Sequence, residues 1–206
     1  MAKINIGATK SALSTFSQSY ADIGDLMSGI NGDYFNGIDK YWDTQTAYKY
    51  FSSMAKSLNG TIKSMNSAFK EACDCIQKAA DNIASAEGGE KVGTVSFSSI
   101  SNISIEWQGK DDGYNIPLNG ETAELTKNKF TTPMSQVKES CKSCRQAMIN
   151  IKDSGLGKDI SGDAIDGITS MIDKVKEIMA EYDSNAVSSA SNEDANAKGY
   201  KINTGN

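Results

Sequence analysis

The stretch TQTAYKYFSSMAKSLNGTIKSMNSAFKEACDCIQKAADNIASA, residues 44–86, carries one uninterrupted apolar rhythm, and this rhythm decides the fold. Its apolar residues recur at spacings of three and four, which places them on one face of an α-helix. The members of this stripe are Ala47, Phe51, Met54, Leu58, Ile62, Met65, Phe69, Ala72, Ile76, Ala80 and Ile83. The pair Asn59-Gly60 is typical of a turn, but one glycine costs a helix only about 1 kcal/mol. The sequence therefore predicts a single helix over residues 44–86, roughly 65 Å long.

A second apolar stripe precedes this helix. It consists of Leu13, Phe16, Tyr20, Ile23, Met27, Ile30 and Tyr34. Asn36-Gly37 can end the first helix, and Asp43 or Thr44 can cap the next one. Residues 1–90 are therefore predicted to form a helical hairpin.

The apolar period changes from helical to two after residue 90. The alternating residues are Val95 and Phe97, then Ile103, Ile105 and Trp107, then Tyr114, Ile116 and Leu118. Alternation of this kind predicts strands near 94–98, 102–108 and 113–118. We therefore expect a small antiparallel β insertion over residues 92–118, within a segment bounded by residues 91 and 120.

Helical periodicity returns after residue 120. One stripe consists of Phe130, Met134, Val137, Cys141, Cys144, Met148 and Ile151, and another of Ile165, Ile168, Ile172, Val175, Met179 and Tyr182. Pro133 suits a first helical turn, with Thr132 as its cap. The sequence predicts a second helical hairpin over residues 121–185 and a disordered polar tail over 186–206.

A helix with a single apolar stripe needs a partner to be stable in water. Two such hairpins on one chain can close an antiparallel four-helix bundle. The predicted fold is therefore mainly α, a four-helix bundle of two hairpins with the β insertion between them. Because the chain supplies both hairpins at a high effective concentration, we expect a monomer.

The composition argues against several classes of function. The net charge is -5 and the pI near 4.9, whereas nucleic-acid binding needs a concentrated basic surface. The chain has no histidine, so histidine-based metal sites and the usual nucleophilic triads are excluded. No apolar run approaches the roughly 20 residues of a membrane helix, and the start has no Sec-type signal peptide. We expect no enzymatic activity, cofactor or membrane span.

The four cysteines form two close pairs. Cys141 and Cys144 continue an apolar stripe, where thiols behave as small hydrophobic groups. Cys73 and Cys75 lie about 200° apart around a helix and cannot both face one ion. Core packing is the prediction for Cys141 and Cys144, and a metal site or a disulfide is the alternative.

Two segments carry a family resemblance. In YWDTQTAYKYF, residues 41–51, Trp42 lies in the bend between two stripes, followed by Thr44, Ala47 and the pair Tyr50-Phe51. In DISGDAIDGI, residues 159–168, Ile160, Gly162 and Ala164 take the equivalent places. The chain thus resembles the WXG-type helical-hairpin family of type VII secretion, and the related LXG-type targeting regions, as two degenerate tandem hairpins.

The literal W-x-G tripeptide of the chain is Trp107-Gln108-Gly109. It ends a run of period two and is followed by KDDGYNIP, which cannot start a helix. We therefore predict Trp107 to be a strand aromatic and not the tryptophan of a hairpin bend.

The resemblance implies a non-enzymatic protein associated with type VII secretion in a Gram-positive bacterium. Such a protein is an exported substrate or an escort that acts through helix-mediated contacts with another protein. Its partner would be a component of the secretion machinery, a toxin or another WXG-like protein. The chain would be made in the cytoplasm and exported to the medium or cell surface without a Sec signal. The alternatives are a structural or surface interaction module, and a helical pore-forming toxin with a β tongue.

Overall fold

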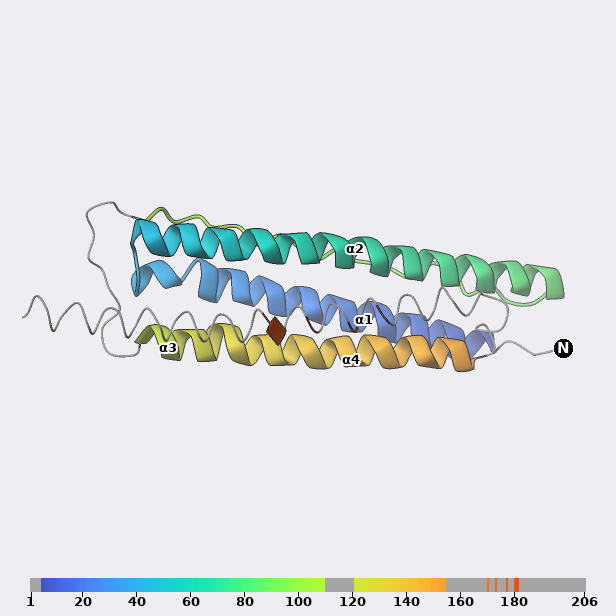
Figure 1. Ribbon diagram of the computed structural model, residues 1–206. Helices are drawn as coiled ribbons and strands as arrows, with labels where there is room; N and C mark the ends of the chain where they lie inside the picture. Colours follow the sequence, from blue (N-terminus) through green and yellow to red (C-terminus); the bar gives the residue numbers. More distant parts are fainter. Residues whose placement is uncertain are drawn as a thin grey trace, which may run out of the picture. The chain divides into compact units, whose positions relative to one another are not determined.

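The computed structural model describes residues 5–109 and 121–154, together with Ser170, Asp173, Glu177, Ala180 and Glu181. This part of the chain is mainly helical and contains no β-strand. Its three long helices are α1 (Ile6–Ile30), α2 (Gln45–Glu87) and α4 (Thr132–Asp153), as Figure 1 shows. The prediction of a mainly α protein is confirmed.

The chain divides into two compact units, and each long helix contributes to both. The first unit contains Met1–Gly24, Ile62–Ile100 and Lys138–Glu177. The second unit contains Asp25–Thr61, Ser101–Val137 and Ile178–Asn206.

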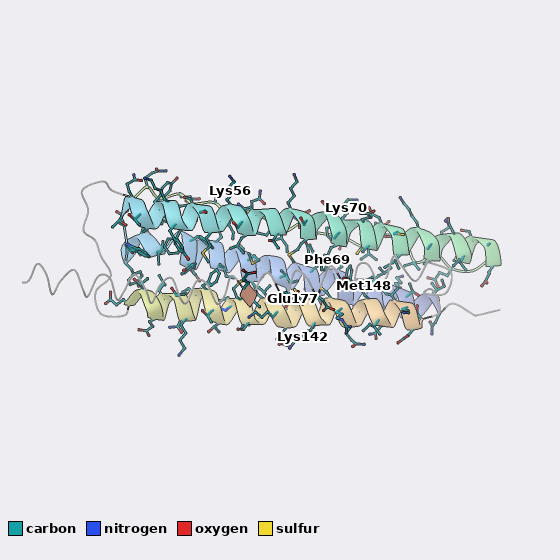
Figure 2. The ribbon with its side chains drawn as sticks, viewed as in Figure 1. Lys56, Phe69, Lys70, Lys142, Met148 and Glu177 are labelled. Atoms are coloured by element: carbon teal, nitrogen blue, oxygen red, sulfur yellow. The ribbon has the colours of Figure 1, made fainter. Side chains whose placement is uncertain are left out.

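The core of the first unit forms where the predicted stripes of α1, α2 and α4 meet. The Phe16 ring of α1 stacks on the Phe69 ring of α2 with centroids 5.1 Å apart. On the α4 side, the buried Cys144 thiol faces the Phe16 carbonyl, with sulfur and oxygen 3.9 Å apart. Figure 2 shows Phe69 and Met148 inside this unit, while the exposed Lys70 and Lys142 point away from it.

The core of the second unit is built from aromatic side chains. After α1 the chain makes a π-helical turn, η1 (Asn31–Phe35), and a 3-10 turn, η2 (Ile38–Lys40). The Tyr34 ring of η1 meets Phe51 of α2 edge-on at 5.6 Å and Phe130 at 4.8 Å. All three rings are fully buried, so the predicted stripes again form the core.

The predicted long helix is confirmed, since α2 spans Gln45–Glu87 without a break. Thr44 precedes its first residue, and the Thr44 hydroxyl accepts a hydrogen bond from the Ala47 amide at 3.1 Å. This bond satisfies one of the free amides of the first turn, so Thr44 is the N-cap. The helix passes through Gly60, whose missing Cβ would meet no atom within 4 Å.

Pro133 lies in the first turn of α4 (Thr132–Asp153) as predicted, but the prediction that Thr132 is an N-cap is wrong. Thr132 has helical angles, φ -66 and ψ -50, and the helical path already begins with α3 (Glu121–Thr126). A π-helical stretch, η3 (Lys127–Thr131), joins α3 to α4 immediately before Pro133. Proline has no amide hydrogen to donate one turn back, and a widened turn accommodates this missing bond.

The strands predicted near 94–98 and 102–108 are also wrong, since neither range contains a β-strand. The alternation itself is present from Ile103 to Gly109, because residues 103, 107 and 109 are buried while residues 104, 106 and 108 are exposed. Within the described residues the backbone there bonds to side chains of α2 and of the turn after α1, and to no neighbouring strand. The predicted strand 113–118 lies outside the described residues.

Most of the predicted last helix and the whole predicted tail, 186–206, also lie outside the described residues. Ser170, Asp173, Glu177, Ala180 and Glu181 are helical, in agreement with a helix in this region. Across the described parts of the chain, no helix is long and apolar enough to cross a membrane.

The cysteines lie as helix geometry predicts. Cys73 is buried while Cys75, two residues further along α2, is exposed, and Cys141 and Cys144 are both fully buried. In the described residues no group of three or more acidic or cysteine side chains could hold a metal ion. The predicted core position of Cys141 and Cys144 is confirmed.

Burial should make three of the four thiols unreactive. Burial raises the pKa of both Cys73 and Cys144, so neither forms the nucleophilic thiolate near neutral pH. We expect a thiol reagent at pH 8 to modify one cysteine of the native protein, Cys75, and all four after denaturation. A Cys75→Ser variant should show no rapid labelling, and rapid labelling of two or more thiols in native protein would contradict this expectation.

The same burial predicts a loss of stability in alkali. Burial, assisted by the neighbouring Asp74 charge, raises the pKa of Cys73 from 9.0 to about 12. Since the folded pKa is the higher one, this stabilisation is complete below about pH 9 and is lost as pH rises toward 12. We expect the free energy of unfolding, measured by denaturant titration, to fall on the order of 1 kcal/mol by pH 10 through Cys73 alone. Cys73→Ala should reduce this fall, and an unchanged pH dependence in that variant would refute the assignment.

Candidate interaction site at the hairpin bend

The bend between α1 and α2 holds the first set of predicted site residues. Trp42 is 4% exposed and meets the Phe51 ring edge-on, with centroids 5.7 Å apart. Its amide donates to the Ile38 carbonyl at 2.8 Å, which fixes the backbone of the bend. Trp42 therefore anchors the bend in the core of the second unit.

The other predicted site residues divide into two groups. Thr44 caps α2 through a hydrogen bond from the Ala47 amide to its side chain. Ala47 itself is fully buried. The structure thus brings Trp42, Thr44 and Ala47 together at one bend. Ile160, Gly162 and Ala164 lie outside the described residues.

The literal W-x-G tripeptide packs against this same bend. The Trp107 indole donates to the Phe35 carbonyl at 2.5 Å, and its ring meets Tyr48 edge-on at 5.5 Å. The centroid of the Trp107 ring also lies 6.5 Å from the centroid of the Phe51 ring, which Trp42 contacts. Trp107 is 9% exposed, so it is a second aromatic anchor of the bend.

Gly109 makes the closest backbone approach at the site. A Cβ atom there would lie 2.1 Å from the Thr44 carbonyl oxygen and 2.7 Å from the Gln45 amide nitrogen. Only a residue without a side chain fits at that distance. Sequence reasoning missed this role of the tripeptide, because no pattern near residue 107 indicates contact with residue 44.

Four amide side chains hold residues 101–109, which we call the bound segment. Asn31 and Asn36 come from the η1 side, and Gln45 and Asn59 come from α2; we call these four residues the amide clamp. Each amide offers both a hydrogen-bond donor and an acceptor, which is the complement of an extended backbone. Figure 1 shows the bound segment running beside α2.

The contacts of the amide clamp are bidentate at two positions. The Asn59 side chain accepts from the Ile103 amide and donates to the Ile103 carbonyl, both at 2.7 Å. The Asn36 side chain accepts from the Glu106 amide and donates to the Ser104 carbonyl, both at 2.9 Å. The clamp therefore binds backbone amide and carbonyl groups, and every residue except proline offers both.

Two single bonds, from Asn31 and Gln45, complete the clamp. Asn31 accepts from the Ser104 amide at 3.1 Å, and Gln45 donates to the Gly109 carbonyl at 2.9 Å. Each such bond contributes about 1 kcal/mol net, so the clamp stabilises the segment by several bonds of modest strength. The buried Ile103 and Trp107 side chains add the apolar part.

The spacing of the clamp fits the two backbones it joins. Asn59 and Gln45 are fourteen residues apart on α2, a rise of about 21 Å. Ile103 and Gly109, which they bind, are six residues apart, and an extended chain of that length spans about 20 Å. One helix can therefore hold both ends of an extended segment without strain.

In the first unit, side chains of α2 also hydrogen-bond to the backbone of a non-helical segment. The Asn66 side chain accepts from the Ile100 amide at 2.8 Å and donates to its carbonyl at 2.9 Å. Gln77 accepts from the Val95 amide at 3.3 Å, and Asp81 accepts from the Val92 amide at 2.7 Å. Polar residues of α2 thus satisfy an extended backbone in each unit.

Charge contributes little to this region. The Lys129 ammonium lies 3.3 Å from the Asp33 carboxylate, but both side chains are about half exposed, so this pair is worth little. Burial raises the pKa of Tyr34, so its hydroxyl is neutral at physiological pH. The site is therefore suited to binding through shape, backbone bonds and aromatic packing.

Comparison with known proteins returns no match for this chain among family models, curated proteins or solved structures.

Proposed function

We propose that the chain is a non-enzymatic protein of a type VII-like secretion system, acting through helix-mediated contacts with a protein partner. In this proposal residues 121–185 form the second helical hairpin and complete an antiparallel four-helix bundle. The protein is an exported substrate or an escort of a Gram-positive bacterium and works as a monomer.

The observation that carries the proposal is the hairpin of α1 and α2 with Trp42 buried in its bend. The family resemblance implies a tryptophan in the bend ahead of a helix that opens with small residues, and here the buried Trp42 precedes the Thr44 cap and the buried Ala47. The aromatic anchor holds the bend in place, and the exposed residues of α1 and α2 are available to a partner.

A second observation concerns the kind of chemistry available. The bend holds aromatic rings, a residue type enriched at protein interfaces, and amide side chains that hydrogen-bond to backbone groups. These groups favour an interaction protein.

The export proposal is tested by secretion from a Gram-positive host with an active type VII system. A tagged chain should accumulate in the medium of that host and remain in cells that lack the secretion ATPase. A cytoplasmic marker protein controls for lysis. Retention of the chain in both strains, or equal release from both, would contradict export and favour an interaction module unrelated to secretion.

A further inference from the structure

The amide clamp and the bend together have the features of a peptide-binding site. They contact residues 101–109 through backbone bonds, two apolar anchors and one position restricted to glycine. None of these contacts requires the bound segment to belong to the same chain. We infer that the amide clamp is a binding site for an extended peptide of a partner protein, which residues 101–109 fill as an internal ligand.

The contacts define the peptide that the site would accept. An apolar residue is needed at the position of Ile103, whose side chain is buried. Tryptophan is needed four residues later, because the Trp107 indole donates to the Phe35 carbonyl. Glycine is needed two residues after that, because a Cβ would lie 2.1 Å from the Thr44 oxygen. The ligand class is therefore an extended peptide of pattern apolar-x-x-x-Trp-x-Gly.

Several features make the bound segment exchangeable. Among the described residues it has no strand neighbour, and the hydrogen bonds that hold its backbone there come from side chains. Five of its nine residues are exposed. Three of its backbone hydrogen bonds are exposed to solvent, and segments held by such bonds open locally without global unfolding. A partner peptide competes with a segment of millimolar effective concentration, so exchange needs either a tight ligand or a weakened segment.

The inference stands independently of the export role, because it depends only on contacts within the second unit. Its test uses the full chain with Ile103→Ser and Trp107→Ala, which removes both anchors and leaves the clamp intact. The probe is a fluorescein-labelled peptide, SNISIEWQG, with the sequence of residues 101–109. Fluorescence anisotropy should give a micromolar Kd for this double variant and binding at least tenfold weaker to the wild-type chain.

Three matched controls distinguish specific from non-specific binding of the peptide. A peptide with alanine in place of its glycine should bind at least tenfold more weakly. Adding Asn59→Leu to the double variant should weaken binding by at least tenfold, since two backbone bonds are lost. Adding Ser57→Ala should change nothing, because the exposed Ser57 lies about 160° around α2 from Asn59.

The inference fails if a double variant with native helical content does not bind the peptide, or if the alanine peptide binds equally well. The choice of ligand is wrong if the double variant forms mixed dimers with the wild-type chain and these dimers do not bind the peptide. The occupant of the clamp would then be a second copy of the chain. Hydrogen exchange of the wild-type protein gives an answer even if the double variant does not fold. The amides of Ile103, Ser104 and Glu106 should then exchange faster than the α2 core amides, and exchange only by global unfolding would overturn the inference.

Discussion

Replacing Trp42 with alanine is expected to lower the free energy of unfolding by about 3–5 kcal/mol. The side chain is 4% exposed and packs edge-on against Phe51, so its removal leaves a cavity at the bend. For a chain of this length the loss corresponds to a decrease in melting temperature on the order of 10 °C. Thermal unfolding followed by circular dichroism at 222 nm measures it.

Lys40→Ala is the matched control, because Lys40 lies in the same bend and is exposed. Its effect should stay within about 0.5 kcal/mol. An unchanged melting curve for Trp42→Ala would show that the tryptophan does not anchor the bend. If secretion were lost at the same time, Trp42 would be a recognition residue instead.

Replacing Gly109 with alanine is expected to destabilise the protein by about 1–3 kcal/mol, the usual cost of forcing extra volume into a packed site. The new methyl group would lie 2.1 Å from the Thr44 carbonyl oxygen, a backbone atom that cannot rotate away as the end of a side chain can. The end of the bound segment must therefore move, and the bond between the Gln45 side chain and the Gly109 carbonyl should be lost.

The same substitution at Gly60 should have the opposite sign. Gly60 lies inside α2 with no atom within 4 Å of the added Cβ, and alanine favours a helix by about 1 kcal/mol over glycine. Comparing the two variants by denaturant unfolding separates the steric effect from the general effect of adding a methyl group. Equal effects at the two glycines would contradict the close approach at Thr44.

The helical part of the fold could be predicted because the residues buried on one face of a helix recur at spacings of three and four in the sequence. The positions of Leu13, Phe51 and Met148 within their stripes predicted their burial correctly. The continuity of α2 through Gly60 could be predicted for the same reason, since an unbroken stripe needs an unbroken helix.

The amide clamp could not be predicted, because alternation shows which side chains are buried and not which groups satisfy the backbone. The pattern around Ile103 and Trp107 fits a strand and a clamped segment equally well. Asn59 illustrates the difficulty, since with Gly60 it has the form of a turn signal, whereas in the structure it binds a backbone 44 residues away. Likewise, no pattern in the sequence predicts the contact between Gly109 and Thr44.

The pairing of α2 with an extended backbone limits where the chain can change length. One residue inserted between Ile103 and Gly109 would shift the segment by about 3.3 Å and place a side chain where only glycine fits. The same holds in the first unit between Val95 and Ile100, which are fixed by Gln77 and Asn66. Insertions should be accepted instead at residues 88–91, where Gly88 adopts φ 71 and the side chains are exposed, ahead of the clamped Val92. Length variation between natural versions of this protein is therefore expected to concentrate there and to avoid both clamped stretches.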